Sequence, residues 1–186
     1  MNRLADSEVE ELRGVAWAAI ERGAEGGGGM LTVESKDYPE ALRAPRASFV
    51  TLRKGGQLRG CMGSLEARMP LVEDVACNAY NAAFKDPRFD PVGGDEIPGL
   101  DLKLSVLSPP EPVPVSSEED LLRQLQPGVD GVILQAGGRR GTFLPAVWDM
   151  LPNPREFLCQ LKRKAGLPED YWSDEMTIQR YGADEY

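Results

Sequence analysis

Apolar and polar residues alternate most clearly in Leu100–Leu107, where a leucine or valine occupies every second position. Successive side chains of a β-strand point to opposite faces, so this pattern predicts a strand with one apolar face. The buried residues should be Leu102, Leu104 and Val106, with the polar residues between them turned away. A strand with one buried and one polar face is typical of an antiparallel sheet.

Two further pairs of apolar runs, each separated by two glycines, predict β-hairpins. Glycine readily adopts the positive φ angles that tight hairpin turns need. The runs are Phe49–Leu52 with a return strand from Leu58, around Gly55-Gly56, and Val129–Gln135 with Arg139–Leu144, around Gly137-Gly138. A last strand is predicted at Met176–Tyr181.

Apolar residues spaced three and four positions apart predict helices between these strands. The first should begin at a capping box formed by Ser7 and Glu10 and should stop near Gly23. The second should have Pro70 as its first residue and end near Lys85, because a proline follows shortly afterwards. The remaining helices are predicted at 117–125, 145–150 and 153–166, and residues 34–46 should be mostly loop.

The strands come mainly as hairpins rather than as β-α-β units, which predicts an α+β fold with a largely antiparallel sheet flanked by helices. The chain has 186 residues, of which 41% are hydrophobic, enough for a sizeable core. That length suits one domain, or one domain with a small subdomain. We therefore expect residues 1–186 to form a single domain.

Charge and cysteine content narrow the class of protein. The formal net charge of −9 argues against binding to nucleic acid or to acidic membranes. No apolar run approaches the ~20 residues of a membrane span, and the acidic N-terminus lacks the order of a signal peptide. Three widely spaced cysteines, Cys61, Cys77 and Cys159, indicate neither a disulfide framework nor a metal site, and free thiols favour the cytoplasm.

The sequence contains no histidine. This excludes Ser-His-Asp and Cys-His catalytic machinery, zinc sites that contain histidine, and proton transfer by an imidazole. Neither a metal-binding motif nor a cofactor motif is present, so no cofactor is expected. Any acid–base chemistry would depend on carboxylates, thiols or water.

The first unusual stretch is Leu58–Leu65, which carries an arginine and a thiol between glycines. Strand alternation predicts that Arg59, Cys61 and Gly63 share one face. Glycine within a strand packs nothing, which makes sense where another backbone or a ligand must come close, at Gly60 and at Gly63. The alternative is a core thiol beside a bulge, because free cysteine is among the most buried residue types.

The second unusual stretch is Asp86–Pro91, in which two prolines restrict the backbone around Asp86, Arg88 and a second aspartate. One interpretation is that Asp86 caps a turn and pairs with Arg88. The other is that both contact a ligand. We predict that Asp86-Pro87-Arg88 lies near the face of Arg59 and Cys61 and that the two stretches line one cleft. Of the three cysteines, Cys61 alone should lie in or beside a cleft.

Six segments together resemble the AMMECR domain family, also known as protein A of the AmmeMemoRadiSam system. They follow one another over nearly the whole chain, and Met62 and Ser64 replace an isoleucine and a threonine that are frequent in the family. The segments are Leu58-Arg59-Gly60-Cys61-Met62-Gly63, Asp86-Pro87-Arg88-Phe89, Leu104–Pro110, Pro127–Val132, Thr142-Phe143-Leu144-Pro145 and Leu161–Leu167.

The resemblance implies a larger subdomain built from both chain ends and a smaller one inserted between them. It also implies two possible partners, a Memo-like protein and a radical-SAM enzyme. It supplies no activity. Fold and partners are therefore expectations that come from the family, separate from what the residue patterns predict.

Two functions remain open at this point. In the enzyme hypothesis, Cys61 is a nucleophile and Arg59 favours its reactive thiolate, with Asp86 or Asp130 as proton acceptor. A small anionic substrate would contact the remaining candidate residues, which are Gly60, Gly63, Asp86, Arg88, Arg140 and Thr142. Arg139 would add to the positive field. In the binding hypothesis, Cys61 only packs, and the same surface binds an anion, a peptide or a partner protein. The lack of a metal or cofactor motif favours binding.

Overall fold

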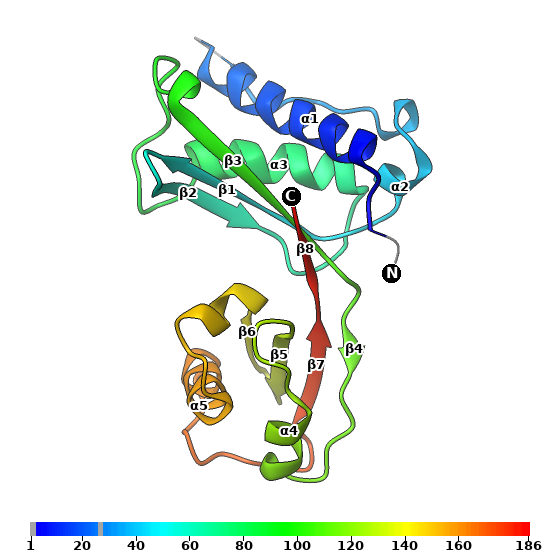
Figure 1. Cartoon of the computed structure of the whole chain (residues 1–186), viewed down its shortest axis with the longest axis vertical. Helices are drawn as coiled ribbons and strands as arrows, with labels where there is room; N and C mark the ends of the chain where they lie inside the picture. Colours follow the sequence, from blue (N-terminus) through cyan, green and yellow to red (C-terminus); the bar gives the residue numbers. More distant parts are fainter. Residues whose placement is uncertain (1–2, 26–27) are drawn as a thin grey trace. The chain divides into compact units, whose positions relative to one another are not determined.

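The computed structural model describes residues 3–25 and 28–186. The chain divides into two compact units: unit 1 holds the residues up to Leu107 together with Asp184–Tyr186, and unit 2 is Ser108–Ala183. This organisation confirms the expected larger part built from both chain ends with a smaller part inserted (Figure 1). The sequence predicted one largely antiparallel sheet. The structure has two four-stranded sheets instead, one in each unit.

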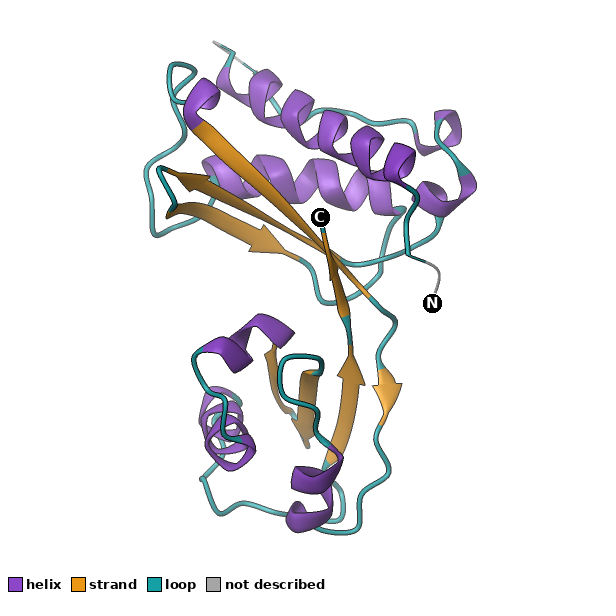
Figure 2. Ribbon diagram, viewed as in Figure 1, coloured by secondary structure: helices purple, strands orange, loops and turns teal. Residues whose placement is uncertain are grey.

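Unit 1 contains a four-stranded sheet covered by helices. Its strands are β1 (Ser48–Lys54), β2 (Gln57–Gly63), β3 (Leu100–Leu107) and β8 (Ala183–Glu185), in the order β2-β1-β3-β8. The helices are α1 (Asp6–Ala24), α2 (Glu40–Arg43) and α3 (Leu71–Phe84), with short 3₁₀ turns at Ser35–Asp37 and Ile97–Gly99. Helix α3 packs against β1 and β2, and α1 packs against α3 (Figure 2).

Strand β3 has the predicted bounds and the predicted buried face. Leu102 is 5% exposed, and Leu104 and Val106 are fully buried. These side chains join the apolar residues of α1, α3 and β1 in one core. Asp101 and Lys103 are exposed, as the alternation requires. Strand β8 lies along the outer edge of β3. Directly after β8, Tyr186 exchanges two backbone hydrogen bonds with Leu104, at 3.0 and 2.9 Å.

The helix starts differ from the sequence prediction. Helix α1 begins at Asp6, and the Glu8 side chain accepts the backbone N–H of Ala5 at 2.8 Å, so the predicted capping box of Ser7 and Glu10 is wrong. Because the helix starts earlier, its first turn contains the acidic residues Asp6 and Glu8. Pro70 is the cap residue that precedes α3 rather than its first helical residue. The segment predicted as loop contains α2.

Unit 2 contains a second antiparallel sheet, with the order β4-β7-β5-β6. Its strands are β4 (Glu111–Pro112), β5 (Gly131–Ala136), β6 (Arg139–Phe143) and β7 (Thr177–Tyr181). Its helices are α4 (Glu118–Gln124) and α5 (Pro154–Lys164), with a 3₁₀ turn at Pro145–Asp149. The predicted second hairpin and last strand are thereby confirmed. Within the described residues, no helix is long and apolar enough to cross a membrane.

Candidate functional site

The hairpin of β1 and β2 contains a bulge at Arg59. Leu52 lies opposite Gly60 and Arg53 lies opposite Leu58, so Arg59 has no partner residue across the pair. A bulge inserts one residue into one strand and interrupts the alternation of side chains. The inference that Arg59 and Cys61 share a face rested on that alternation, which holds only from Gly60 onwards.

Both glycines of the motif are explained by packing inside unit 1. A Cβ atom on Gly60 would lie 2.1 Å from the backbone oxygen of Ala82 in α3. A Cβ atom on Gly63 would lie 2.2 Å from the ring of Phe49 on β1. Gly60 therefore allows the backbone of β2 to approach the backbone of α3, and Gly63 makes room for an aromatic side chain.

Cys61 is half-buried on the edge strand β2, and its backbone is held by the second unusual stretch. Its N–H donates to Asp86 Oδ2 at 2.9 Å, and its carbonyl accepts from Arg88 Nη2 at 3.4 Å. Its sulfur lies 3.3 Å from Thr51 Oγ1. An edge strand leaves backbone groups without a partner strand, and here the Asp86–Arg88 pair takes the place of that partner.

Asp86 and Arg88 form a close ion pair at the end of α3. Arg88 Nε donates to Oδ1 at 2.9 Å and Nη2 donates to Oδ2 at 2.7 Å, while the backbone N–H of Arg88 donates to Oδ1 at 3.1 Å. The hydrogen bonds from Arg88, with a further one from the backbone of Cys61, hold the pKa of Asp86 well below its usual range. The geometry matches the interpretation in which Asp86 caps the turn and pairs with Arg88.

Arg59 is paired with Glu96, a residue that the sequence did not single out. Arg59 Nε and Nη2 donate to the two carboxylate oxygens at 3.1 and 2.9 Å, and Nη1 donates to the carbonyl of Asp90 at 3.0 Å. Lys54 also donates to Glu96, at 3.0 Å. Hydrogen bonds from Arg59 and then from Lys54 lower the pKa of Glu96 to about 2.

Phe89 connects the two ion pairs. The guanidinium of Arg59 lies 6.0 Å and that of Arg88 lies 5.6 Å from the centre of its ring, within the range of cation–π contacts. We call Arg59, Cys61, Asp86, Arg88, Phe89 and Glu96 the edge cluster. The cluster brings both unusual stretches together, through the backbone of Cys61 and the ring of Phe89.

The other predicted site residues belong to unit 2. Thr142 Oγ1 lies 3.1 Å from the hydroxyl of Tyr181, whose pKa is raised to about 12 by burial. Asp130 accepts the backbone N–H of Gln126 at 2.8 Å, and Arg139 donates to the carbonyl of Gly166. Arg140, also in this unit, is an exposed residue of β6. Asp130, Arg139 and Thr142 thus have partners within unit 2.

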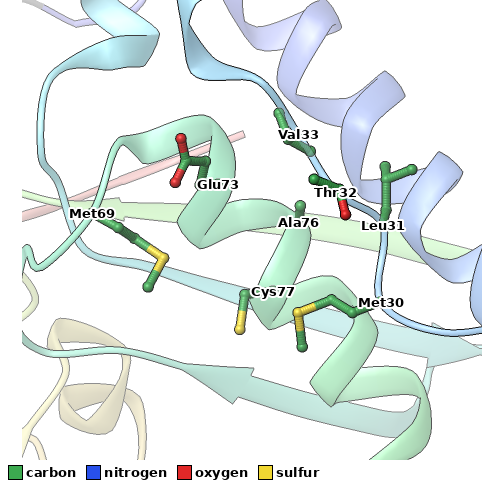
Figure 3. A pocket seen from close by; sticks show the side chains of 8 residues that line it. All are labelled: Met30, Leu31, Thr32, Val33, Met69, Glu73, Ala76 and Cys77. Carbon is green, nitrogen blue, oxygen red and sulfur yellow. The ribbon is translucent and has the colours of Figure 1, made fainter.

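A separate hollow of about 290 Å³ lies beside α3 (Figure 3). Its lining residues are Met30, Leu31, Thr32, Val33, Met69, Glu73, Ala76 and Cys77. The prediction that Cys61 alone would lie at a cleft is wrong, because Cys77 lines this one. Burial, and then the charge of Asp74, raise the pKa of the Cys77 thiol, whose sulfur accepts a hydrogen bond from Asn81 at 3.4 Å.

The structure defines an α+β protein in which one sheet-and-helix unit is interrupted by a second, with two arginine–carboxylate pairs around an edge-strand cysteine. The AMMECR1 family model matches residues 14–186. The chain belongs to the AMMECR1 family, which confirms the resemblance seen in the sequence.

Relatives match over nearly the whole length. A protein of Methanothermobacter thermautotrophicus is 39% identical over 97% of this chain and 94% of its own length. A protein of Thermotoga maritima is 40% identical over 85% of this chain and 87% of its own. The crystal structure of the uncharacterized protein PH0010 from Pyrococcus horikoshii superposes with a TM-score of 0.84 at 34% identity, covering 98% of this chain and 92% of that one.

The depressed pKa of Glu96 predicts an acid-sensitive contribution to stability. A carboxylate whose pKa is lower in the folded than in the unfolded chain stabilises the fold above its ordinary pKa of 4.5, and this contribution is lost as pH falls toward about 2. Glu96→Gln should lower the free energy of unfolding at pH 7 by about 1 kcal/mol. It should also flatten the dependence on pH below about 5, as measured by urea unfolding at several pH values. Glu34→Gln, in an exposed ion pair with Lys36, is the control and should leave the free energy of unfolding at pH 7 nearly unchanged.

Proposed function

We propose that this chain is a binding or accessory domain that acts through partner proteins, and that it is not a stand-alone cysteine enzyme. One observation carries the proposal: both arginines near Cys61 are engaged by carboxylates. Arg59 is paired with Glu96 and Arg88 with Asp86, each through two hydrogen bonds. A cation activates a thiol when its charge is free to favour the thiolate, and these charges are already balanced.

The enzyme hypothesis also requires a proton acceptor for the Cys61 thiol, and Asp86 is poorly suited to that role. A general base works best when its pKa is near the working pH. Asp86 accepts a hydrogen bond from the backbone of Cys61 at 2.9 Å, and its pKa lies well below the usual range because Arg88 and the backbone of Cys61 donate to it. Asp86 therefore takes up a proton poorly at neutral pH, and its contact is with the backbone of Cys61 rather than with the thiol.

The edge cluster has features that suit recognition. The Arg88 side chain is 54% exposed, and its guanidinium lies over the ring of Phe89. Arginine and aromatic residues are enriched among the residues that contribute most to protein interfaces. We propose that this surface binds the partners that the family resemblance implies, a Memo-like protein or a radical-SAM enzyme. A small anionic ligand on Arg88 is the competing occupant.

The test is direct binding with purified proteins. The Memo-like protein and the radical-SAM enzyme encoded in the same genome would be titrated separately against the full chain by isothermal calorimetry. Phe89→Ala should weaken binding of the true partner at least tenfold, as interface hot spots do. Arg68→Ala is the matched control, because Arg68 is 76% exposed and pairs with Glu66 two residues away. Absence of binding by the wild type, or equal affinities for wild type and Phe89→Ala, would overturn the proposal.

One observation favours the enzyme alternative. Arg88 Nη2 donates to the carbonyl of Cys61 at 3.4 Å, so a guanidinium lies beside this residue. The alternative predicts that Arg59→Ala slows alkylation of Cys61 by tenfold or more at pH 7. The binding proposal predicts a change within about twofold. Mass spectrometry of time points would report Cys61 separately from Cys77 and Cys159.

A further inference from the structure

Three sulfur-containing side chains from separate segments line the hollow beside α3. Met30 lies in the segment after α1, Met69 precedes α3, and Cys77 lies on α3 itself. In the view of Figure 3, the sulfur atoms of the two methionines flank that of the cysteine. Met30 is distant in the sequence from Met69 and Cys77, so the fold and not a local motif brings it to the same hollow.

This concentration of sulfur is unusual for the chain. It has six methionines and three cysteines among 186 residues, yet three of the eight residues that line the hollow carry sulfur. The methionines do not serve as core filling, because Met30 is 49% and Met69 is 36% exposed. Both methionines are therefore partly exposed residues of the lining, which an incoming ligand can reach.

The donor types select the class of ligand. Thiolate and thioether sulfur are ligands for soft metal ions, and Cu(I) is the first-row ion that accepts methionine readily. Within the residues that the structure describes, no group of three or more His, Cys, Asp or Glu side chains is placed to hold a metal ion. A site for a harder divalent ion would need such a group. The sulfur set therefore suits Cu(I).

We propose that Met30, Met69 and Cys77 form a binding site for one Cu(I) ion, separate from the edge cluster. The ion displaces the thiol proton of Cys77 to solvent and forms a Cu–S bond, with no change in the oxidation state of copper. One thiolate balances the single charge of the ion. The carboxylates of Glu73, in the lining, and Asp74, beside Cys77, add negative potential that attracts a cation.

The hollow also permits closure of the site. Its volume of about 290 Å³ exceeds the needs of a bare ion, so the sulfur ligands must draw together around the metal. Methionine has three rotatable side-chain bonds and adapts to irregular spaces, which allows Met30 and Met69 to close over an ion bound to Cys77. The alternative is that the hollow is an ordinary apolar one that binds no metal. The experiment below distinguishes these two interpretations.

The experiment is an anaerobic titration of the full chain with Cu(I), in competition with a coloured Cu(I) chelator. The wild type should bind one Cu(I) ion per chain. Its dissociation constant should be lower than the free Cu(I) concentration at which the chelator is half-saturated. Cys77→Ser should lose this binding, and the double variant Met30→Leu, Met69→Leu should bind at least tenfold more weakly. Cys159→Ser and Met150→Leu are the controls and should match the wild type, since Met150 is 76% exposed in unit 2.

X-ray absorption of the loaded protein provides a second readout and should count three sulfur ligands on copper. Equal affinity of the double methionine variant and the wild type would overturn the proposal, as would loss of binding in Cys159→Ser or a first shell without three sulfurs. The methionine positions are partly exposed, so their replacement by leucine tests the site even if Cys77→Ser fails to fold.

Discussion

Leu104→Ala is expected to lower the free energy of unfolding by about 2–5 kcal/mol. Leu104 is fully buried in the middle of β3, opposite Val50 on β1 and hydrogen-bonded through its backbone to Tyr186. Truncation removes apolar contacts in the core of unit 1 and leaves a cavity that neighbours on both sides cannot fill without moving. Urea unfolding of the full chain, followed by circular dichroism, measures the loss.

Asp101→Ala is the matched control on the same strand. Asp101 is exposed, and an ordinary surface change is expected to stay within about 0.5 kcal/mol. If Leu104→Ala were no more destabilising than Asp101→Ala, the inward face assigned to β3 would be wrong. A large loss in both variants would instead indicate that the strand pairing itself had been disturbed.

Gly60→Ala is expected to destabilise the protein by about 1–3 kcal/mol, the range for overpacking. The added Cβ would lie 2.1 Å from the Ala82 oxygen, which belongs to a helix backbone and cannot rotate away as a side chain can. Strand β2 must therefore move away from α3. The movement should also loosen the hydrogen bond from Cys61 to Asp86, seen as faster hydrogen exchange of the Cys61 amide.

Gly14→Ala supplies a control with the opposite sign. Gly14 lies within α1, and a Cβ atom there would meet nothing within 4 Å. Alanine should stabilise the helix by about 0.5–1 kcal/mol, because glycine loses more backbone entropy on folding. A stabilising Gly60→Ala, or an unchanged exchange rate at Cys61, would contradict the close approach of β2 and α3.

The elements that the sequence predicted well depend on local patterns. Alternation fixed the buried face of β3, and the glycine pairs marked both hairpin turns, where Gly55 and Gly137 have φ near +57° and +58°. The elements that it missed have no such pattern. Strand β8 is three residues long and is defined by its pairing with a strand about 80 residues earlier, and α2 has only four residues. Long-range pairing of this kind leaves no local signature.

The candidate site shows the same division. Cys61, Asp86 and Arg88 stood out because glycines and prolines surround them, and the fold brings these stretches together. Their contacts could not be predicted, because the bulge at Arg59 depends on the register with β1. Glu96 is one of 30 acidic residues, and no spacing distinguished it as the partner of Arg59. The sequence did not indicate the sulfur-lined hollow, because its lining comes from two separate stretches of the chain, Met30–Val33 and Met69–Cys77.

The late position of β8 in the chain has a consequence for biosynthesis. Strand β3 is complete once residue 107 has been made, but the strand that covers its outer edge comes after the whole of unit 2. At a translation rate of about 5–20 residues per second, roughly 4–16 seconds pass before that edge is paired. An unpaired edge strand readily recruits other chains. A chain that has not yet reached Ala183–Glu185 therefore carries an open β-edge on β3, so unit 1 is exposed to association with other chains until β8 has been made.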